Sequence, residues 1–152
     1  MTHACADVPS EPLHVRSRFA DAEVSPGDVM TFPDGVPGYE SQRHFVLLDI
    51  AETAPLKVLH AVNAPDPCFL VTDPRSILPG YRCDLSDADR LRVGAVDDRL
   101  LLWLVIVSIR EDGHVTVNLR APIVINPERM IGRQVMPNGC VYPLHHVIER
   151  GE

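Results

Sequence analysis

The segment from Val117 to Gln134 limits the possible folds of this chain more than any other part of the sequence. It is a strand-like apolar run that contains Pro122 and has an asparagine near each end, Asn118 and Asn126. Because proline cannot donate to a sheet ladder, the run predicts an edge or bulge position for Pro122. The asparagines predict turns, since their side chains bond to nearby backbone groups. The segment has no acid–base pair, no nucleophile beside a histidine and no metal-ligand spacing, which favours a binding protein over an enzyme.

Short β-strands are expected along the whole chain. Fourteen prolines and nine glycines are spread over 152 residues, which disfavours long helices. The apolar run 100–111 and the alternating run 114–119, joined by an Asp-Gly turn, predict a hairpin. A second hairpin is predicted at Asn138, joining 133–136 to 140–142. Further strand-like runs lie at 13–19, 29–32, 45–48, 56–62 and 68–72.

One short helix is predicted among these strands. Ser86 is a good N-cap, acidic residues follow it in the first turn, and Gly94 ends the helix after a turn or two. Eight to ten strands with one short helix predict an all-β, mainly antiparallel fold, either a small barrel or a compact sandwich. We expect residues 1–13 to form a flexible N-terminal tail and residues 14–150 a single barrel-like domain.

The charge of the chain is unevenly distributed. The formal net charge is −7, and residues 1–52 contain nine acidic residues against three arginines. Phosphate binding needs clustered positive charge, so direct binding to nucleic acid is not expected. Clustered acids favour encounter with a basic partner, and solvated charge that only keeps the protein soluble is the alternative.

No membrane or export segment is predicted. The first residues have neither the basic region nor the apolar core of a signal peptide. The longest apolar run, 100–107, is far shorter than the roughly 20 residues that a spanning helix needs. The sequence therefore predicts a cytoplasmic protein whose four singly placed cysteines stay reduced, disulfides being the less favoured alternative. These cysteines are Cys5, Cys68, Cys83 and Cys140.

Groups that could perform catalysis or bind a metal are sparse. The sequence has no glycine-rich phosphate loop and no Gly-x-Ser-x-Gly elbow. Cys140 with His145 and His146, joined in space by Cys68 or Cys83, is the best metal candidate. It lacks the paired spacing of structural zinc sites, so no metal and no cofactor are expected. The alternative function is a small-molecule-binding β-barrel or a hydrolase that uses His145 or His146 with an aspartate.

Several motifs occur in an order that is typical of one protein family. They are Phe32–Tyr39, Phe69–Pro74, Tyr81 with Asp84-Leu85, Val117–Asn126, Gly132–Gln134, and Tyr142 with His145-His146. Together these residues resemble the flagellar assembly factor family FliW, over about residues 30–148. The segment Asn118–Asn126 is the most specific of the motifs.

This resemblance implies a small antiparallel barrel-like fold without enzymatic activity. Members of the family bind cytosolic flagellin and the carbon storage regulator CsrA, a basic homodimer that represses flagellin translation at the mRNA leader. Flagellin and CsrA compete for the factor, so that export of flagellin frees the factor to capture CsrA and translation resumes. Such a partner switch needs only a difference of affinities and no chemical step.

Six polar or amphipathic residues in or near these motifs are the candidate partner contacts, because groups beside rigid turns make pre-organised contacts. They are Asp34, Tyr39, Glu40, Asp84, Asn126 and Gln134. The chain departs from the family pattern at two places. His60-Ala61 stands where a Gln-Ser pair is usual, and Arg133 stands where a lysine is usual, which keeps the charge but changes the donor geometry. The first change is a candidate alteration of a contact surface.

Overall fold

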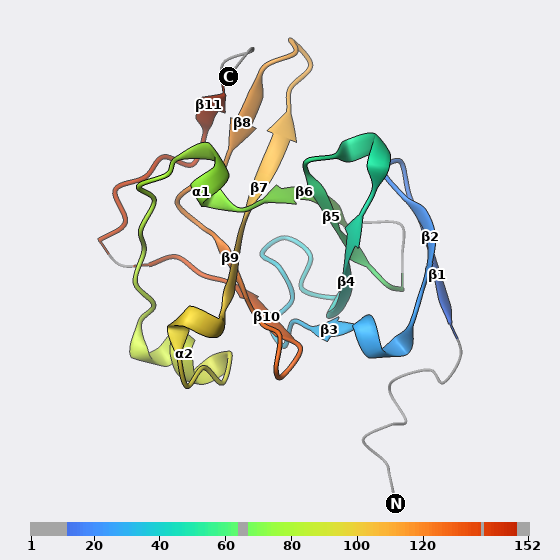
Figure 1. Cartoon of the computed structure of the whole chain (residues 1–152), viewed down its shortest axis with the longest axis horizontal. Helices are drawn as coiled ribbons and strands as arrows, with labels where there is room; N and C mark the ends of the chain where they lie inside the picture. Colours follow the sequence, from blue (N-terminus) through green and yellow to red (C-terminus); the bar gives the residue numbers. More distant parts are fainter. Residues whose placement is uncertain (1–11, 64–66, 138, 149–152) are drawn as a thin grey trace, which may run out of the picture.

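A closed β-barrel organises the computed structural model, which describes residues 12–63, 67–137 and 139–148 (Figure 1). The strands are β1 (Leu13–Arg16), β2 (Asp21–Val24), β3 (Met30–Thr31), β4 (His44–Asp49), β5 (Lys57–Ala61), β6 (Cys68–Thr72), β7 (Leu102–Ile109), β8 (Val115–Val117), β9 (Ile123–Asn126), β10 (Ile131–Gln134) and β11 (His146–Ile148). Two α-helices, α1 (Pro74–Ile77) and α2 (Asp87–Arg92), and three 3-10 turns, η2 (Pro26–Asp28), η3 (Ala51–Thr53) and η4 (Asp98–Leu100), connect them.

The barrel consists of seven strands in the order β7-β6-β5-β4-β3-β10-β9, closed by a second pairing between β9 and β7. All of these pairings are antiparallel except that of β3 with β10, which is parallel at Thr31 and Ile131. Strands β8 and β11 extend the sheet beyond β7, and the β1–β2 hairpin forms a separate two-stranded sheet. The predicted all-β, mainly antiparallel barrel is therefore confirmed.

Strand β7 is long enough to pair with three strands, β6, β8 and β9. Its first residues, Leu102–Leu104, pair with β9, while Val107–Ile109 pair with β8. Between β8 and β9 the chain bends at Asn118, whose side-chain oxygen accepts hydrogen bonds from the backbone N–H groups of Arg120 (3.2 Å) and Ala121 (3.0 Å). The predicted turn at Asn118 is therefore confirmed, and it divides one apolar run into two strands.

The predicted position of Pro122 at a sheet edge is wrong. Pro122 immediately precedes β9, which lies between β7 and β10 inside the closed barrel. The first position before a strand tolerates proline because no ladder donor is needed there. Its carbonyl still contributes, accepting a hydrogen bond of 2.9 Å from the backbone N–H of Val135.

Local signals for the helix and the first hairpin are confirmed. β7 and β8 form the predicted hairpin, and the Ser86 hydroxyl caps α2 by accepting from the backbone N–H of Asp89 at 3.1 Å. Gly94, with φ +68°, follows the helix as predicted. The expectation of a single helix is wrong, because the chain also forms the one-turn helix α1. The Asp73 carboxylate caps α1 by accepting a hydrogen bond from the backbone N–H of Arg75.

The predicted hairpin at Asn138 is also wrong. Residues 140–142 form no strand, and β10 pairs with β9 on one side and with β3 on the other. Asn138 itself lies outside the described residues. Of the predicted tail, residues 1–11 lie outside them as well, and Leu13 begins β1.

Aromatic and aliphatic side chains fill the barrel interior. Phe32 and Phe45 are fully buried, with ring centroids 4.9 Å apart. The Phe32 ring lies against the backbone of Gly132 in β10, where an added Cβ would overlap the ring. The β1–β2 hairpin packs Val15 and Val24 against Val46 of β4, outside the barrel. Among the described residues no helix is both long and apolar enough to cross a membrane.

Gly132→Ala should reduce the free energy of unfolding by about 1–3 kcal/mol, because a fully buried ring must move to admit the methyl group. Gly27→Ala is the control, since no heavy atom lies within 4 Å of a Cβ at that position. Urea unfolding of both variants measures the difference. Equal stability of the two variants would show that the Phe32 ring moves aside without cost.

Candidate partner-binding surface

The loop 33–40 is a rigid turn that presents three of the predicted contact residues. Gly35 and Gly38 have φ angles of +66° and +92°, which only glycine adopts readily. A Cβ at Gly35 would lie 2.6 Å from the Cα of Glu40, so the two ends of the loop touch. Val36 is buried and anchors the loop, and its carbonyl accepts a hydrogen bond of 2.7 Å from the N–H of Tyr39.

The three contact residues of this loop are all exposed to solvent. The Asp34 carboxylate forms an ion pair with the Arg133 guanidinium. Tyr39 is 44% exposed, and its ring packs edge-on against Phe69 with centroids 5.8 Å apart. The Glu40 carboxylate accepts a hydrogen bond of 3.0 Å from a backbone N–H of the same loop, which holds the pKa of Glu40 below its usual value. The loop thus presents an exposed aromatic ring and two exposed carboxylates, of which that of Asp34 is paired with Arg133.

Arg133 joins this loop to helix α2. Its Nε donates to the Asp89 carboxylate at 3.1 Å, while its Nη1 faces Asp34. The side chain of Arg133 is only 21% exposed, and its guanidinium lies between two carboxylates from different parts of the chain. The predicted contact Gln134 follows it in β10 and is half-buried, with Nε2 donating to the carbonyl of Ala121 at 3.0 Å.

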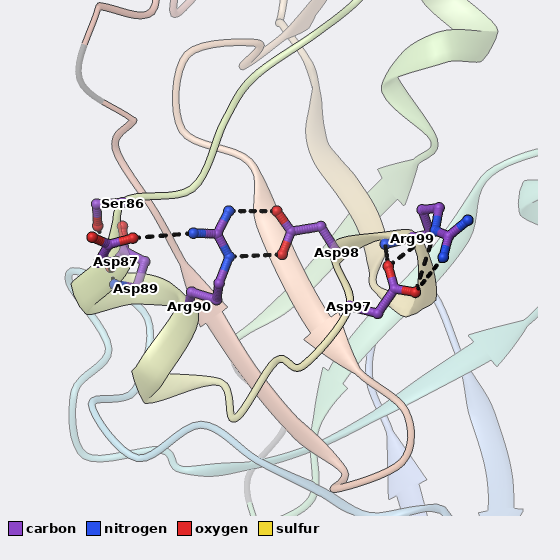
Figure 2. Close-up of polar contacts among 7 residues, drawn as sticks. All are labelled: Ser86, Asp87, Asp89, Arg90, Asp97, Asp98 and Arg99. Atoms are coloured by element: carbon purple, nitrogen blue, oxygen red, sulfur yellow. Dashed lines mark hydrogen bonds and ion pairs between the residues drawn. The ribbon is translucent and has the colours of Figure 1, made fainter.

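A second set of ion pairs fixes α2 to the turn η4 (Figure 2). The Arg90 guanidinium donates to both oxygens of Asp98, through Nε at 2.9 Å and Nη2 at 2.6 Å, and also contacts Asp87 at 3.2 Å. This two-point contact lowers the pKa of the Asp98 carboxyl, because it stabilises the charged form. The bidentate geometry fixes the orientation of the helix as well as its position.

Asp97 and Arg99 form a smaller unit beside this contact. The Asp97 carboxylate accepts from the backbone N–H of Arg99 at 2.9 Å and from its guanidinium at 2.8 Å, so that Asp97 caps η4. These hydrogen bonds lower the pKa of Asp97. Local sequence reasoning did not find the contacts of Arg90 and Arg133. The residues that Arg133 joins are far apart in sequence, which leaves no local signal.

Asn126, another predicted contact, has a structural role. It is only 5% exposed, and its Nδ2 donates to the carbonyls of Val93 (2.8 Å) and Gly94 (3.2 Å). Its Oδ1 accepts from the backbone N–H of Glu128 at 3.1 Å. With its amide bonded on both sides, Asn126 attaches the end of α2 to the β9–β10 turn. It leaves little surface for a partner.

Asp84, the last predicted contact, lies at the rim of a cleft of about 450 Å³. The cleft has mixed charge and is lined by residues of α1, the segment 79–84, η4 and β7, among them Arg75, Arg82, Arg99 and Trp103. From Asp84 to Asp98 the chain carries five aspartates and two arginines. Acidic surface is therefore present around α2 as well as in the first third of the sequence.

The changes at positions 60 and 61 do not alter a contact surface, contrary to expectation. His60 and Ala61 are both fully buried in β5. His60 bonds to the carbonyl of Ala61 through Nδ1 at 2.7 Å. These two residues can affect the binding of a partner only indirectly, by changing how the barrel wall packs.

The residues of the alternative hydrolase or metal site are not arranged for that chemistry in the described part of the chain. His145 Nδ1 lies 3.3 Å from the Arg110 guanidinium, and neither His145 nor His146 pairs with a carboxylate there. Cys140 faces another thiol, that of Cys83, at 3.5 Å. No group of three metal-ligating side chains occurs among the described residues.

Comparisons with known proteins agree on one family. A family model described as FliW protein matches residues 14–148. The flagellar assembly factor FliW of Geotalea uraniireducens (strain Rf4) is 37% identical over 132 residues, which cover 86% of this chain and 80% of that protein. The flagellar assembly factor FliW of Thermoanaerobacter pseudethanolicus is 33% identical over 133 residues, covering 86% and 88%. A crystal structure of the flagellar assembly factor FliW superposes with a TM-score of 0.82 at 29% identity, covering 92% of this chain and 99% of that one.

Arg90→Gln should raise the titration midpoint of Asp98 towards or above its ordinary value of 3.8, because the charged form loses its main partner. The ion pair stabilises the fold above about pH 4, and this contribution is lost as the pH falls through the lowered pKa of Asp98. The stability difference between wild type and Arg90→Gln should therefore shrink at low pH.

Carboxyl NMR titration and urea unfolding at several pH values measure both effects. Arg92→Gln is the matched control, since Arg92 is an exposed arginine of the same helix. An unchanged Asp98 midpoint in Arg90→Gln would contradict the assigned contact.

Proposed function

The chain belongs to the FliW family of flagellar assembly factors, and we propose that it acts in the cytoplasm as a non-enzymatic binding protein for flagellin and CsrA. The observation that supports this most strongly is the extent of the family match. Residues 14–148 include every strand of the barrel, the loop 33–40 and helix α2. The family match therefore covers the complete barrel, which supports an assembly role for this chain.

The loop–α2 surface, defined here as residues 33–40 and 84–92, suits a basic partner. Asp34, Glu40, Asp84 and Asp87 are exposed on it. Exposed carboxylates steer a basic protein such as the CsrA homodimer and increase the rate of encounter. Tyr39 supplies a large, half-exposed ring held by Phe69, and a rigid aromatic residue of this kind is a frequent anchor in interfaces.

A partner switch on this scaffold requires only that flagellin and CsrA compete. While flagellin is abundant in the cytoplasm it occupies the factor, and CsrA stays free to repress translation. Once flagellin is exported, the free factor binds CsrA. The outcome depends on the ratio of each partner's concentration to its dissociation constant. No bond is made or broken in such a switch.

Calorimetric titration with flagellin and with CsrA from the same organism, at two salt concentrations, tests this proposal. We expect saturable binding to each partner, and displacement of CsrA when flagellin is added. Binding to CsrA should weaken at the higher salt, because screening reduces the attraction between exposed charges. Binding to flagellin alone would reject the switch, and binding to neither would reject the proposed function.

The triple variant Asp34→Asn, Glu40→Gln, Asp84→Asn should weaken CsrA binding about tenfold at low salt and flatten its salt dependence, because each exposed charge contributes a modest amount. The matched control Glu23→Gln, Glu52→Gln, Glu111→Gln removes the same charge from exposed positions on β2, η3 and the β7–β8 turn. Equal losses in the two triple variants would show that net charge, and not the loop–α2 surface, attracts the regulator.

A further inference from the structure

Two thiols from distant parts of the sequence meet beside the cleft. The Sγ atoms of Cys83 and Cys140 are 3.5 Å apart, although 57 positions separate them in the sequence. Both side chains are half-buried, and both residues lie in segments without helix or strand. The other described cysteine, Cys68, is buried in β6. The four cysteines are singly placed in the sequence, which favours reduced thiols, and their spacing alone does not select Cys83 over Cys68 as the neighbour of Cys140.

Hydrogen bonds and stacking hold the two segments together. The rings of Tyr81 and Tyr142 stack with centroids 4.5 Å apart and an interplanar angle of 28°. The Tyr142 hydroxyl accepts from the backbone N–H of Arg82 at 3.0 Å. The Tyr81 hydroxyl donates to the carbonyl of Leu119 at 2.7 Å. Each tyrosine is two residues from one of the cysteines, so the stacked rings hold the two segments, and with them the thiols, close together before any reaction.

We propose that Cys83 and Cys140 form a reversible disulfide, with a low-molecular-weight disulfide such as oxidised glutathione as the oxidant. A disulfide needs the sulfurs at about 2.05 Å, so they must approach each other by about 1.5 Å. Segments without regular secondary structure can make this movement without breaking a sheet ladder. This modification site is independent of which partners the protein binds.

The reaction takes place in two exchange steps. The Cys140 thiolate attacks oxidised glutathione, which forms a mixed disulfide on Cys140 and releases one glutathione thiolate. Cys83 then loses its proton to solvent and attacks the Cys140 sulfur, which releases the second glutathione. In total two protein thiols are oxidised to one disulfide, and one glutathione disulfide is reduced to two glutathione thiols.

The environment of the thiols sets the order of these steps. Burial raises the pKa of the Cys83 thiol to about 11, so Cys83 is almost entirely protonated at neutral pH. A protonated thiol is a poor nucleophile, which favours Cys83 as the resolving residue. The high local concentration of the neighbouring sulfur compensates for its small thiolate fraction.

The disulfide would join the cleft wall to the segment that precedes β11. It would close a ring that contains α2, η4 and β7 to β10. Because a cross-link of this span restricts the unfolded chain, the oxidised protein should melt at least roughly 5 °C above the reduced protein. In a reducing cytosol such a bond forms only transiently, as the glutathione pool becomes oxidised.

Incubation of the full-length protein in graded mixtures of reduced and oxidised glutathione tests the proposal. Peptide mapping should recover a Cys83–Cys140 linked peptide, the melting temperature should rise, and dithiothreitol should reverse both changes. Three results would each overturn the proposal: a linkage through Cys5 or Cys68, a glutathione adduct that persists on Cys140, or no oxidation.

Serine variants separate the two roles. Cys83→Ser should retain a stable glutathione adduct on Cys140, because the resolving thiol is gone. Cys140→Ser should form neither the adduct at that site nor the disulfide. Cys68→Ser is the matched control and should form the disulfide as the wild type does. Oxidation of Cys140→Ser at Cys83 as fast as in the wild type would contradict the assigned order.

Discussion

The pairing of β9 with β7 is the interaction on which the rest of the molecule depends. It converts a curled sheet into a closed seven-stranded barrel and pairs the edge of β9 that would otherwise be free. The bend at Asn118 makes the pairing of β9 with β7 possible, because β8 and β9 can then share one edge of β7. Closure also fixes β10, and β10 carries Arg133, which positions both the loop 33–40 and α2.

The negative charge of the loop–α2 surface is partly neutralised within the molecule. Asp98 and Asp89 face arginines, so their negative potential is reduced before any partner arrives. Glu40 differs, because a backbone N–H and not a cation stabilises its charge. A backbone donor keeps a carboxylate ionised while leaving its net charge in place. Glu40 can therefore contribute to the field that a basic protein meets, whereas Asp98 mainly orients α2.

Local sequence signals predicted most strands and helix α2, but they did not predict the long-range contacts. The Asp-Gly turn and the Ser86 cap each act within a few residues, so the β7–β8 hairpin and α2 were found. The parallel pairing of β3 with β10 joins residues about one hundred positions apart, and no periodicity encodes it. The turn signal at Asn138 failed because both edges of β10 were already paired. Asn126 was assigned to the surface for a similar reason: its carbonyl partners at Val93 and Gly94 belong to a distant helix end.

The contacts of Arg133 depend on the shape of its guanidinium group and not only on its charge. A lysine, which the resemblance described above implies at this position, would instead place a compact point charge on a flexible chain. The guanidinium of Arg133 instead directs Nε to Asp89 and Nη1 to Asp34 from one planar group. Two carboxylates on separate elements are thereby held in a fixed relation to each other. In this chain the loop 33–40 and α2 should consequently act as one rigid surface, and a partner must fit both together.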